Sequence, residues 1–88
     1  MDNLKNISKI VKDINSEVEM INFFKELLTK SEIETLSKRW RILDLLAKGK
    51  TQREIAKELQ VSLCKVTRGA KILKDKNSVL SKYLIKEK

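Results

Sequence analysis

The positively charged side chains are distributed unevenly along the chain, and their pattern is suited to binding phosphate groups. Residues 1–47 carry eight basic and eight acidic side chains, whereas residues 48–76 carry nine basic and three acidic ones. The last twelve residues complete a net charge of +8. A neutral first half followed by a basic second half is typical of a scaffold that carries a nucleic-acid-binding surface. The alternative interpretation is a lysine-rich composition whose only consequence is solubility.

Catalytic and metal-binding chemistry has few suitable residues in this chain. It has no histidine and a single cysteine, Cys64. The usual zinc ligand sets are therefore incomplete, and an intrachain disulfide is impossible. We identify no nucleophile–base pair and no glycine-rich phosphate loop, so we expect neither an enzyme nor a metal site. Cys64 has no obvious partner for a redox switch, and we expect it to have a structural or contact role.

The length of 88 residues indicates one domain, spanning 1–88. A chain of this size buries only about 60–65% of its unfolded surface, so we expect oligomerisation to add stability. No apolar run approaches the roughly 18–20 residues of a membrane span, and the first ten residues lack the order of a signal peptide. We therefore expect a cytoplasmic protein without a membrane partner, which suits a lone reduced thiol.

The spacing of apolar residues predicts an all-α chain of six helices, because the sequence has no proline and only two glycines. A capping box at Thr29 is expected to begin a long helix that ends at Gly49. The other expected helices cover residues 4–14, 17–27, 52–59, 62–74 and 78–86. On the long helix, Trp40 is expected to lie in the core rather than to serve as a ligand platform.

A continuous apolar seam runs through the first two expected helices at spacings of three and four residues. It consists of Leu4, Ile7, Val11, Ile14, Val18 and Ile21. Such a seam is either the core of its own domain or an interface with a second copy. Because the chain is small, we expect the interface, with residues 1–49 as a dimerisation scaffold.

Residues 51–74 have the pattern of a helix-turn-helix. Thr51 begins a second capping box, and Ser62 is the expected N-cap of the second helix. The turn position often held by glycine is Gln60, where a left-handed backbone would cost roughly 1 kcal/mol. The residues expected at buried or closely packed positions are Ile55, Ala56, Leu59, Val61 and Val66.

In this motif the second helix inserts its N-terminal end into the major groove while the first helix crosses the DNA backbone. The expected groove-facing residues are Ser62, Leu63, Cys64, Lys65 and Thr67. Lys65 can donate to guanine, and Leu63 and Cys64 can contact a thymine methyl. The expected phosphate contacts are Gln52, Arg53, Lys57 and Lys74. The alternative is a helical hairpin with a solvated basic face.

Between Leu27 and Tyr83 the sequence resembles the bacterial tryptophan repressor family. The most specific motifs are LLT at 27–29, RWRI at 39–42, QREI at 52–55 and VTRGAKILK at 66–74. The resemblance implies six helices per chain, interlocked into a homodimer. It also implies that L-tryptophan acts as a corepressor and orients two reading heads on a palindromic operator in double-stranded DNA.

The resemblance further implies a tryptophan site. Arg39 and Arg68 would sandwich the indole, and Arg68 would also pair with the carboxylate. Gly69 would leave room for the ring, while Leu28 and Thr29 would come from the partner chain.

Two positions depart from the family pattern. Ile72, one helical turn beyond Arg68, stands where a family serine accepts a hydrogen bond from the ligand ammonium. Glu26 replaces an apolar residue whose backbone carbonyl helps at the same end of the ligand. The lost acceptor would cost about 1–3 kcal/mol of binding free energy. We still expect tryptophan or a related indole compound to bind, with Ile72 lining the site.

Three functions stay open at this point. The leading one is a homodimeric transcriptional repressor with tryptophan as its corepressor. The second is a DNA-binding regulator of the same fold in which Ile72 fills the pocket and no ligand is needed. The third is a basic helical module that binds an acidic protein, which would lack the steep salt dependence of phosphate contacts.

Overall fold

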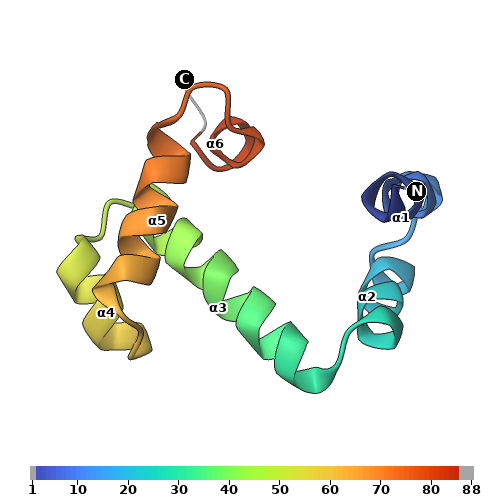
Figure 1. Cartoon of the computed structure of the whole chain (residues 1–88), viewed down its shortest axis with the longest axis horizontal. Helices are drawn as coiled ribbons and strands as arrows, with labels where there is room; N and C mark the ends of the chain where they lie inside the picture. Colours follow the sequence, from blue (N-terminus) through green and yellow to red (C-terminus); the bar gives the residue numbers. More distant parts are fainter. Residues whose placement is uncertain (1, 86–88) are drawn as a thin grey trace. The chain divides into compact units, whose positions relative to one another are not determined.

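The computed structural model describes residues 2–85, and all regular structure in this range is α-helical (Figure 1). The six helices are α1 (Asn3–Asp13), α2 (Glu17–Leu27), α3 (Lys30–Ala47), α4 (Gln52–Leu59), α5 (Leu63–Lys74) and α6 (Val79–Leu84). The all-α prediction is therefore confirmed. The expected end of the last helix, residue 86, lies outside the described residues.

Each helix begins next to a side chain that accepts a hydrogen bond from the backbone N–H three residues further on, which satisfies one of the free donors of the first turn. The accepting residues are Asp2, Ser16, Thr29, Thr51, Ser62 and Ser78. At Thr29 the capping box is complete, because the Thr29 N–H also donates to Glu32 Oε1 at 2.9 Å. The N-terminal signals in the sequence therefore place the helix starts correctly.

Gly49 ends α3, as predicted. Its φ of +96° lies in the left-handed region that favours glycine. The Gly49 N–H donates to the carbonyl of Leu46, and the Lys50 N–H donates to the carbonyl of Leu45. These two bonds form a Schellman motif, which satisfies carbonyls that the helix end leaves free.

The chain forms two compact units, one ending at Glu34 and the other beginning at Thr35. The first contains α1, α2 and the start of α3. The second contains the rest of α3 together with α4, α5 and α6. The single domain expected from chain length stays a prediction, as does its division into scaffold and helix-turn-helix.

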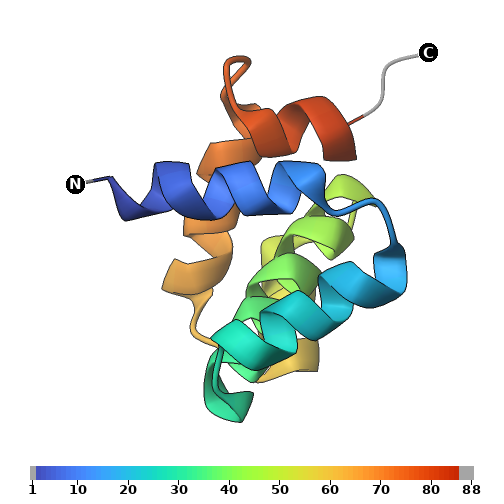
Figure 2. The same cartoon turned by 90° about the vertical axis from the view of Figure 1, so that its right-hand side faces the viewer.

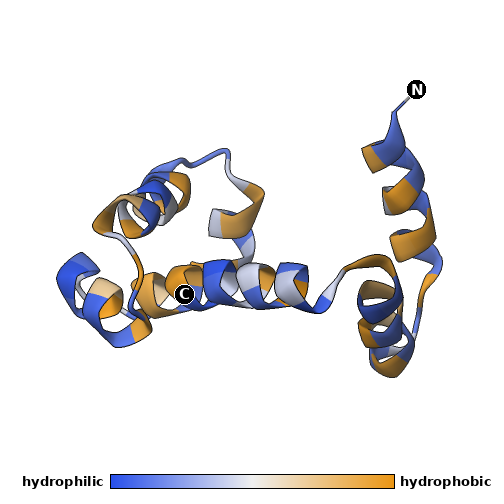
Figure 3. Cartoon of the chain, turned by 60° about the horizontal axis from the view of Figure 1, so that its bottom comes forward, coloured by the Kyte–Doolittle hydropathy of each residue, from blue (hydrophilic) through white to orange (hydrophobic). Residues whose placement is uncertain are grey.

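The apolar seam of the first unit is not a core. Neither α1 nor α2 contains a buried residue, and Leu4 and Val18 are 75% and 68% exposed. Figure 2 shows α1 and α2 as separate helices joined by a bend, and Figure 3 shows hydrophobic residues recurring turn by turn along α1. Within the first unit the seam therefore forms no buried core, and the interface with a second copy stays a prediction.

The core of the second unit lies where α3, α4 and α5 meet. Ile55 of α4 and Val66 of α5 are fully buried, and Ile42 and Leu45 of α3 are buried against them. The partly buried residues packed against them are Leu46, Ala56, Leu59 and Val61. The burial expected for the helix-turn-helix positions is thus confirmed, and α5 is held against the rest of the unit by its Val66 face.

Trp40 is a correction to the sequence analysis, because its side chain is 50% exposed. Ile42 of the same helix is buried at 4% exposure and faces the core. A helix turns by about 100° per residue, so Trp40, two residues earlier, lies on roughly the opposite side. The spacing of apolar residues on α3 predicted that Trp40 would be buried as well, but α4 and α5 cover only the side of α3 that carries Ile42.

Gln60 adopts the left-handed conformation at the end of α4, with φ 55° and ψ 48°. We expect Gln60→Gly to raise the free energy of unfolding by about 0.5–1 kcal/mol, because glycine has no Cβ to strain there. Urea denaturation measures this change. Gln60→Ala is the control and should bring no such gain, and an equal or lower stability of the glycine variant would contradict the strain.

Candidate nucleic-acid interface

The first turn of α4 is held by its capping box. The Glu54 N–H donates to Thr51 Oγ1 at 3.1 Å, and the Thr51 N–H donates to Glu54 Oε1 at 3.0 Å. The backbone hydrogen bond from Thr51 is the largest cause that lowers the pKa of Glu54, followed by the Thr51 hydroxyl. This turn positions two predicted phosphate contacts, with Arg53 exposed and Gln52 half-buried.

The N-terminal end of α5 follows the turn at Gln60. Ser62 caps the helix, since its Oγ accepts from the Lys65 N–H at 3.3 Å. In the first turn the side chains of Leu63, Cys64 and Lys65 are all exposed, with Leu63 at 48%. Three of the predicted groove-facing residues are therefore exposed together at the N-terminal end of α5.

A shallow depression of about 400 Å³ lies along the exposed side of α5. It is lined by Leu63, Cys64, Thr67, Arg68 and Lys71. Residues three and four apart on a helix share one face, so Cys64, Arg68 and Lys71 form a line along it. Lys71 was not among the DNA contacts predicted from the sequence, although its spacing of three residues from Arg68 places it on the same face of α5.

The cations of this surface are not neutralised by neighbouring carboxylates. Within residues 2–85 the ion pairs join Arg41 and Lys50 to Glu58, and Lys48 to Asp44. None of the predicted DNA contacts takes part in these pairs. The exposed cations left for an outside partner are Arg53, Lys57, Lys65, Arg68, Lys71 and Lys74. A surface on which unpaired cations outnumber carboxylates attracts polyanions.

Two predicted DNA contacts are bonded to each other. The Thr67 hydroxyl donates to Gln52 Oε1 at 2.9 Å, and both residues are partly buried. The bond joins the first residue of α4 to the second turn of α5. Sequence reasoning treated the two side chains as independent, because nothing in their spacing of 15 residues marks them as partners.

The residues implied for the tryptophan site are divided between the two units. Arg39, Arg68, Gly69 and Ile72 lie in the second unit, whereas Leu28 and Thr29 lie in the first. Both arginines are exposed and Ile72 is half-buried. The Thr29 hydroxyl is already engaged by the backbone of α3.

Gly69 has a packing role that the resemblance did not imply. A Cβ at this position would lie 3.2 Å from Ile42 Cγ2, 3.3 Å from Leu46 Cδ1 and 3.4 Å from Leu43 Cδ2. The missing side chain therefore allows α5 to approach α3 closely.

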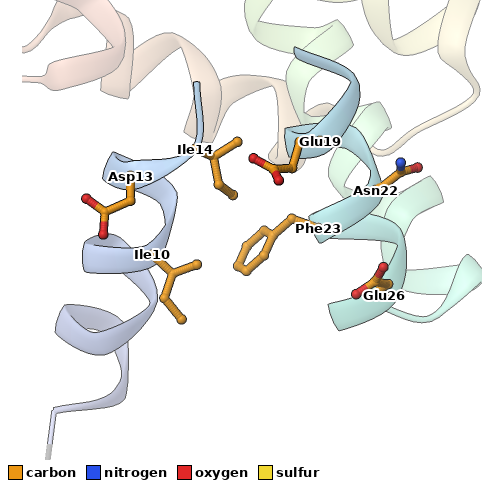
Figure 4. Close-up of a pocket in the computed structure, with 7 residues that line it drawn as sticks. All are labelled: Ile10, Asp13, Ile14, Glu19, Asn22, Phe23 and Glu26. Atoms are coloured by element: carbon orange, nitrogen blue, oxygen red, sulfur yellow. The ribbon is translucent and has the colours of Figure 1, made fainter. Parts of the chain in front are cut away.

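A second hollow lies within the first unit, between α1 and α2, with a volume of about 530 Å³. Figure 4 shows Ile10, Ile14 and Phe23 facing one another across it. The charged residues that line it are all acidic, namely Asp13, Glu19 and Glu26. It is therefore unsuited to phosphate, in contrast to the cationic surface of α4 and α5.

Comparison with known proteins places the chain in a family. The model of the Trp repressor protein family matches residues 2–88. The chain belongs to the Trp repressor family. This family consists of DNA-binding transcriptional repressors and not of enzymes. The resemblance seen in the sequence is thus confirmed.

Three relatives are each named Trp operon repressor homolog. That of Xylella fastidiosa is 43% identical over 70 residues, covering 78% of this chain and 76% of its own. That of Chlamydia caviae is 44% identical over 54 residues, covering 60% and 54%. That of Chlamydia trachomatis serovar D is 36% identical over 67 residues, covering 75% and 71%. No solved structure matches the chain significantly.

The residues that the structure describes, 2–85, were considered for a membrane span and a metal site because both would change the function expected of the chain. No helix among them is long and apolar enough to cross a membrane. Among the same residues, no group of three or more potential ligands is arranged to hold a metal ion.

The capping box of α4 makes its stability depend on pH. Because the pKa of Glu54 is lowered in the folded state, its stabilising contribution is present above the unfolded pKa and is lost as pH falls through the folded value. We expect Glu54→Gln to lower stability near pH 7 and to match the natural protein near pH 2. Urea denaturation at both pH values tests this, and a difference that persists in acid would contradict it.

Proposed function

We propose that this member of the Trp repressor family is a homodimer that binds a palindromic operator in double-stranded DNA through α4 and α5, with L-tryptophan as corepressor. The observation that carries the proposal is the unpaired cationic surface around the free N-terminal end of α5. Phosphate neutralisation by lysine and arginine supplies most of the affinity of such surfaces.

In this proposal the end of α5 enters the major groove. Ser62 and the exposed Leu63, Cys64 and Lys65 face base edges, and Lys65 donates to guanine O6 and N7. Arg53, Lys57 and Lys74, together with Gln52, contact the phosphates on either side. These contacts set the orientation of the protein and carry no sequence information.

The homodimer is supported by the apolar surface of the first unit. Six large apolar residues of α1 and α2 are between 36% and 75% exposed: Leu4, Ile10, Val18, Ile21, Phe24 and Leu27. Apolar surface on this scale is typical of an interface between protein chains. A second copy that covers it would complete one intertwined domain, with residues 1–49 as scaffold, and would present two copies of α5 to successive major grooves.

The tryptophan site is supported by Arg39 and Arg68, which are exposed and make no ion pair among the described residues. A guanidinium group can stack on an indole and can also bind a carboxylate. Gly69 and Ile72 line the α5 side, and Leu28 and Thr29 come from the partner. Ile72 supplies no acceptor for the ligand ammonium, so we propose weaker binding than a serine at this position would give.

A ligand-independent regulator of the same fold is the second candidate. It is favoured by Gly69, whose missing Cβ is explained by packing against Ile42, Leu43 and Leu46 without any ligand. The two candidates differ in whether tryptophan changes the affinity for DNA.

Tryptophan dependence is tested by titrating the protein against a randomised duplex pool with and without millimolar L-tryptophan. We expect the protein to bind DNA in a salt-sensitive way and tryptophan to strengthen this binding. The Ile72→Ser variant should reach half of the tryptophan effect at an about 10-fold lower tryptophan concentration, because its hydroxyl again accepts a hydrogen bond from the ligand ammonium. Equal affinity with and without tryptophan would favour the ligand-independent regulator. Binding that is absent or insensitive to salt would contradict the DNA interface itself.

The roles of two lysines on α5 are separable by mutation. We expect Lys65→Ala to relax preference at one base pair of a selected duplex, whereas Lys74→Ala weakens binding to all sequences alike and reduces the salt slope by about one. Selection from the duplex pool followed by titration measures both effects. A uniform loss in both variants would show that α5 does not read the groove as proposed.

A further inference from the structure

The hydrogen bond between Thr67 and Gln52 assigns different roles to two residues of the proposed interface. The Thr67 hydroxyl donates its only proton to Gln52 Oε1 at 2.9 Å. Phosphate oxygens accept hydrogen bonds and do not donate them. While this bond is present, Thr67 has no proton to give to a phosphate, but the Gln52 side-chain amide keeps both of its N–H groups.

We propose that Thr67 is a positioning residue, which holds the Gln52 side chain so that its Nε2 amide donates to a DNA phosphate. The inference rests on the proposed DNA interface and deepens it. It differs from the expectation drawn from the sequence, in which Thr67 faces the groove, and it makes the contribution of Thr67 to binding depend on Gln52.

The surroundings of the two residues suit this role. Thr67 follows the fully buried Val66 on α5, and Gln52 lies one turn before the fully buried Ile55 on α4. The polar bond therefore lies at the edge of the core, where both backbones are held in place. A long glutamine side chain that is already oriented loses less conformational freedom when it binds a phosphate.

The charge of the donor gives the inference a distinctive signature. Gln52 is neutral, so its contact releases no counterion from DNA and leaves the slope of affinity against salt unchanged. A phosphate contact is also insensitive to base sequence. Breaking the bond between Thr67 and Gln52 should therefore lower the affinity equally for all DNA sequences and leave its dependence on salt unchanged. Loss of a base contact by Thr67 would instead depend on the DNA sequence, and loss of a lysine contact would change the salt dependence.

The experiment measures binding of the full chain to a randomised duplex pool of about 30 base pairs, long enough for two half-sites one helical turn apart. We expect Thr67→Val, which keeps the shape and removes the hydroxyl, to weaken binding about 3- to 10-fold at every salt concentration. Thr67→Ser keeps the hydroxyl and should bind like the natural protein. Urea denaturation of each variant corrects for any change in the folded fraction.

Two further variants separate positioning from direct contact. Gln52→Met has no N–H to donate and, unlike Gln52→Glu, adds no charge, so we expect it to weaken binding at least as much as Thr67→Val with the salt slope unchanged. In a Gln52→Ala background, Thr67→Val should have no further effect on binding. The side-chain amide signals of Gln52 in ¹⁵N spectra of the free protein should shift in Thr67→Val and stay in place in Thr67→Ser.

The outcomes distinguish this inference from the function on which it rests. If the natural protein binds DNA and Thr67→Val loses affinity only for duplexes with a particular base pair, Thr67 reads the groove and the inference is wrong. The inference is equally wrong if Thr67→Val has no effect, or has its full effect in the Gln52→Ala background. If the natural protein shows no salt-dependent binding, the proposed function fails and the inference fails with it.

Discussion

The close approach of α5 to α3 at Gly69 is the constraint on which the rest of the second unit depends. A Cβ there would lie 3.2–3.4 Å from three side chains of α3, so any larger residue would require these side chains to shift by a few tenths of an ångström. The same approach buries Val66 and leaves Cys64, Arg68 and Lys71 on the outer side of α5. The packing that stabilises the unit therefore also decides which side chains of α5 are free to bind an outside partner.

Charge and apolar surface are separated along the chain. The exposed apolar residues of α1 and α2 are not covered within their own unit, and the charged residues that line the hollow between these helices are all carboxylates. The exposed cations of α4 and α5 have no carboxylate partners among the described residues. The surface that requires an apolar partner thus lies on α1 and α2, and the surface that requires an anionic partner lies on α4 and α5. This separation suits the proposed homodimer that binds DNA.

The sequence predicted the secondary structure closely because the determining signals are local. The capping residues Thr29, Thr51 and Ser62 act within one turn of their own position, and so does the stop at Gly49. Signals that depend on three-dimensional packing were missed. The exposure of Trp40, the packing role of Gly69 and the bond between Thr67 and Gln52 all depend on how helices meet, which periodicity within one helix does not specify.

The central claim is that the free N-terminal end of α5 and the first turn of α4 form the surface that meets DNA. Chemical-shift mapping of the ¹⁵N-labelled protein, with and without a duplex selected from a random pool, tests it most directly. The account predicts that the largest shifts fall on residues 62–68 and on the first turn of α4. Shifts confined to α1 and α2, or no shifts at all, would contradict it.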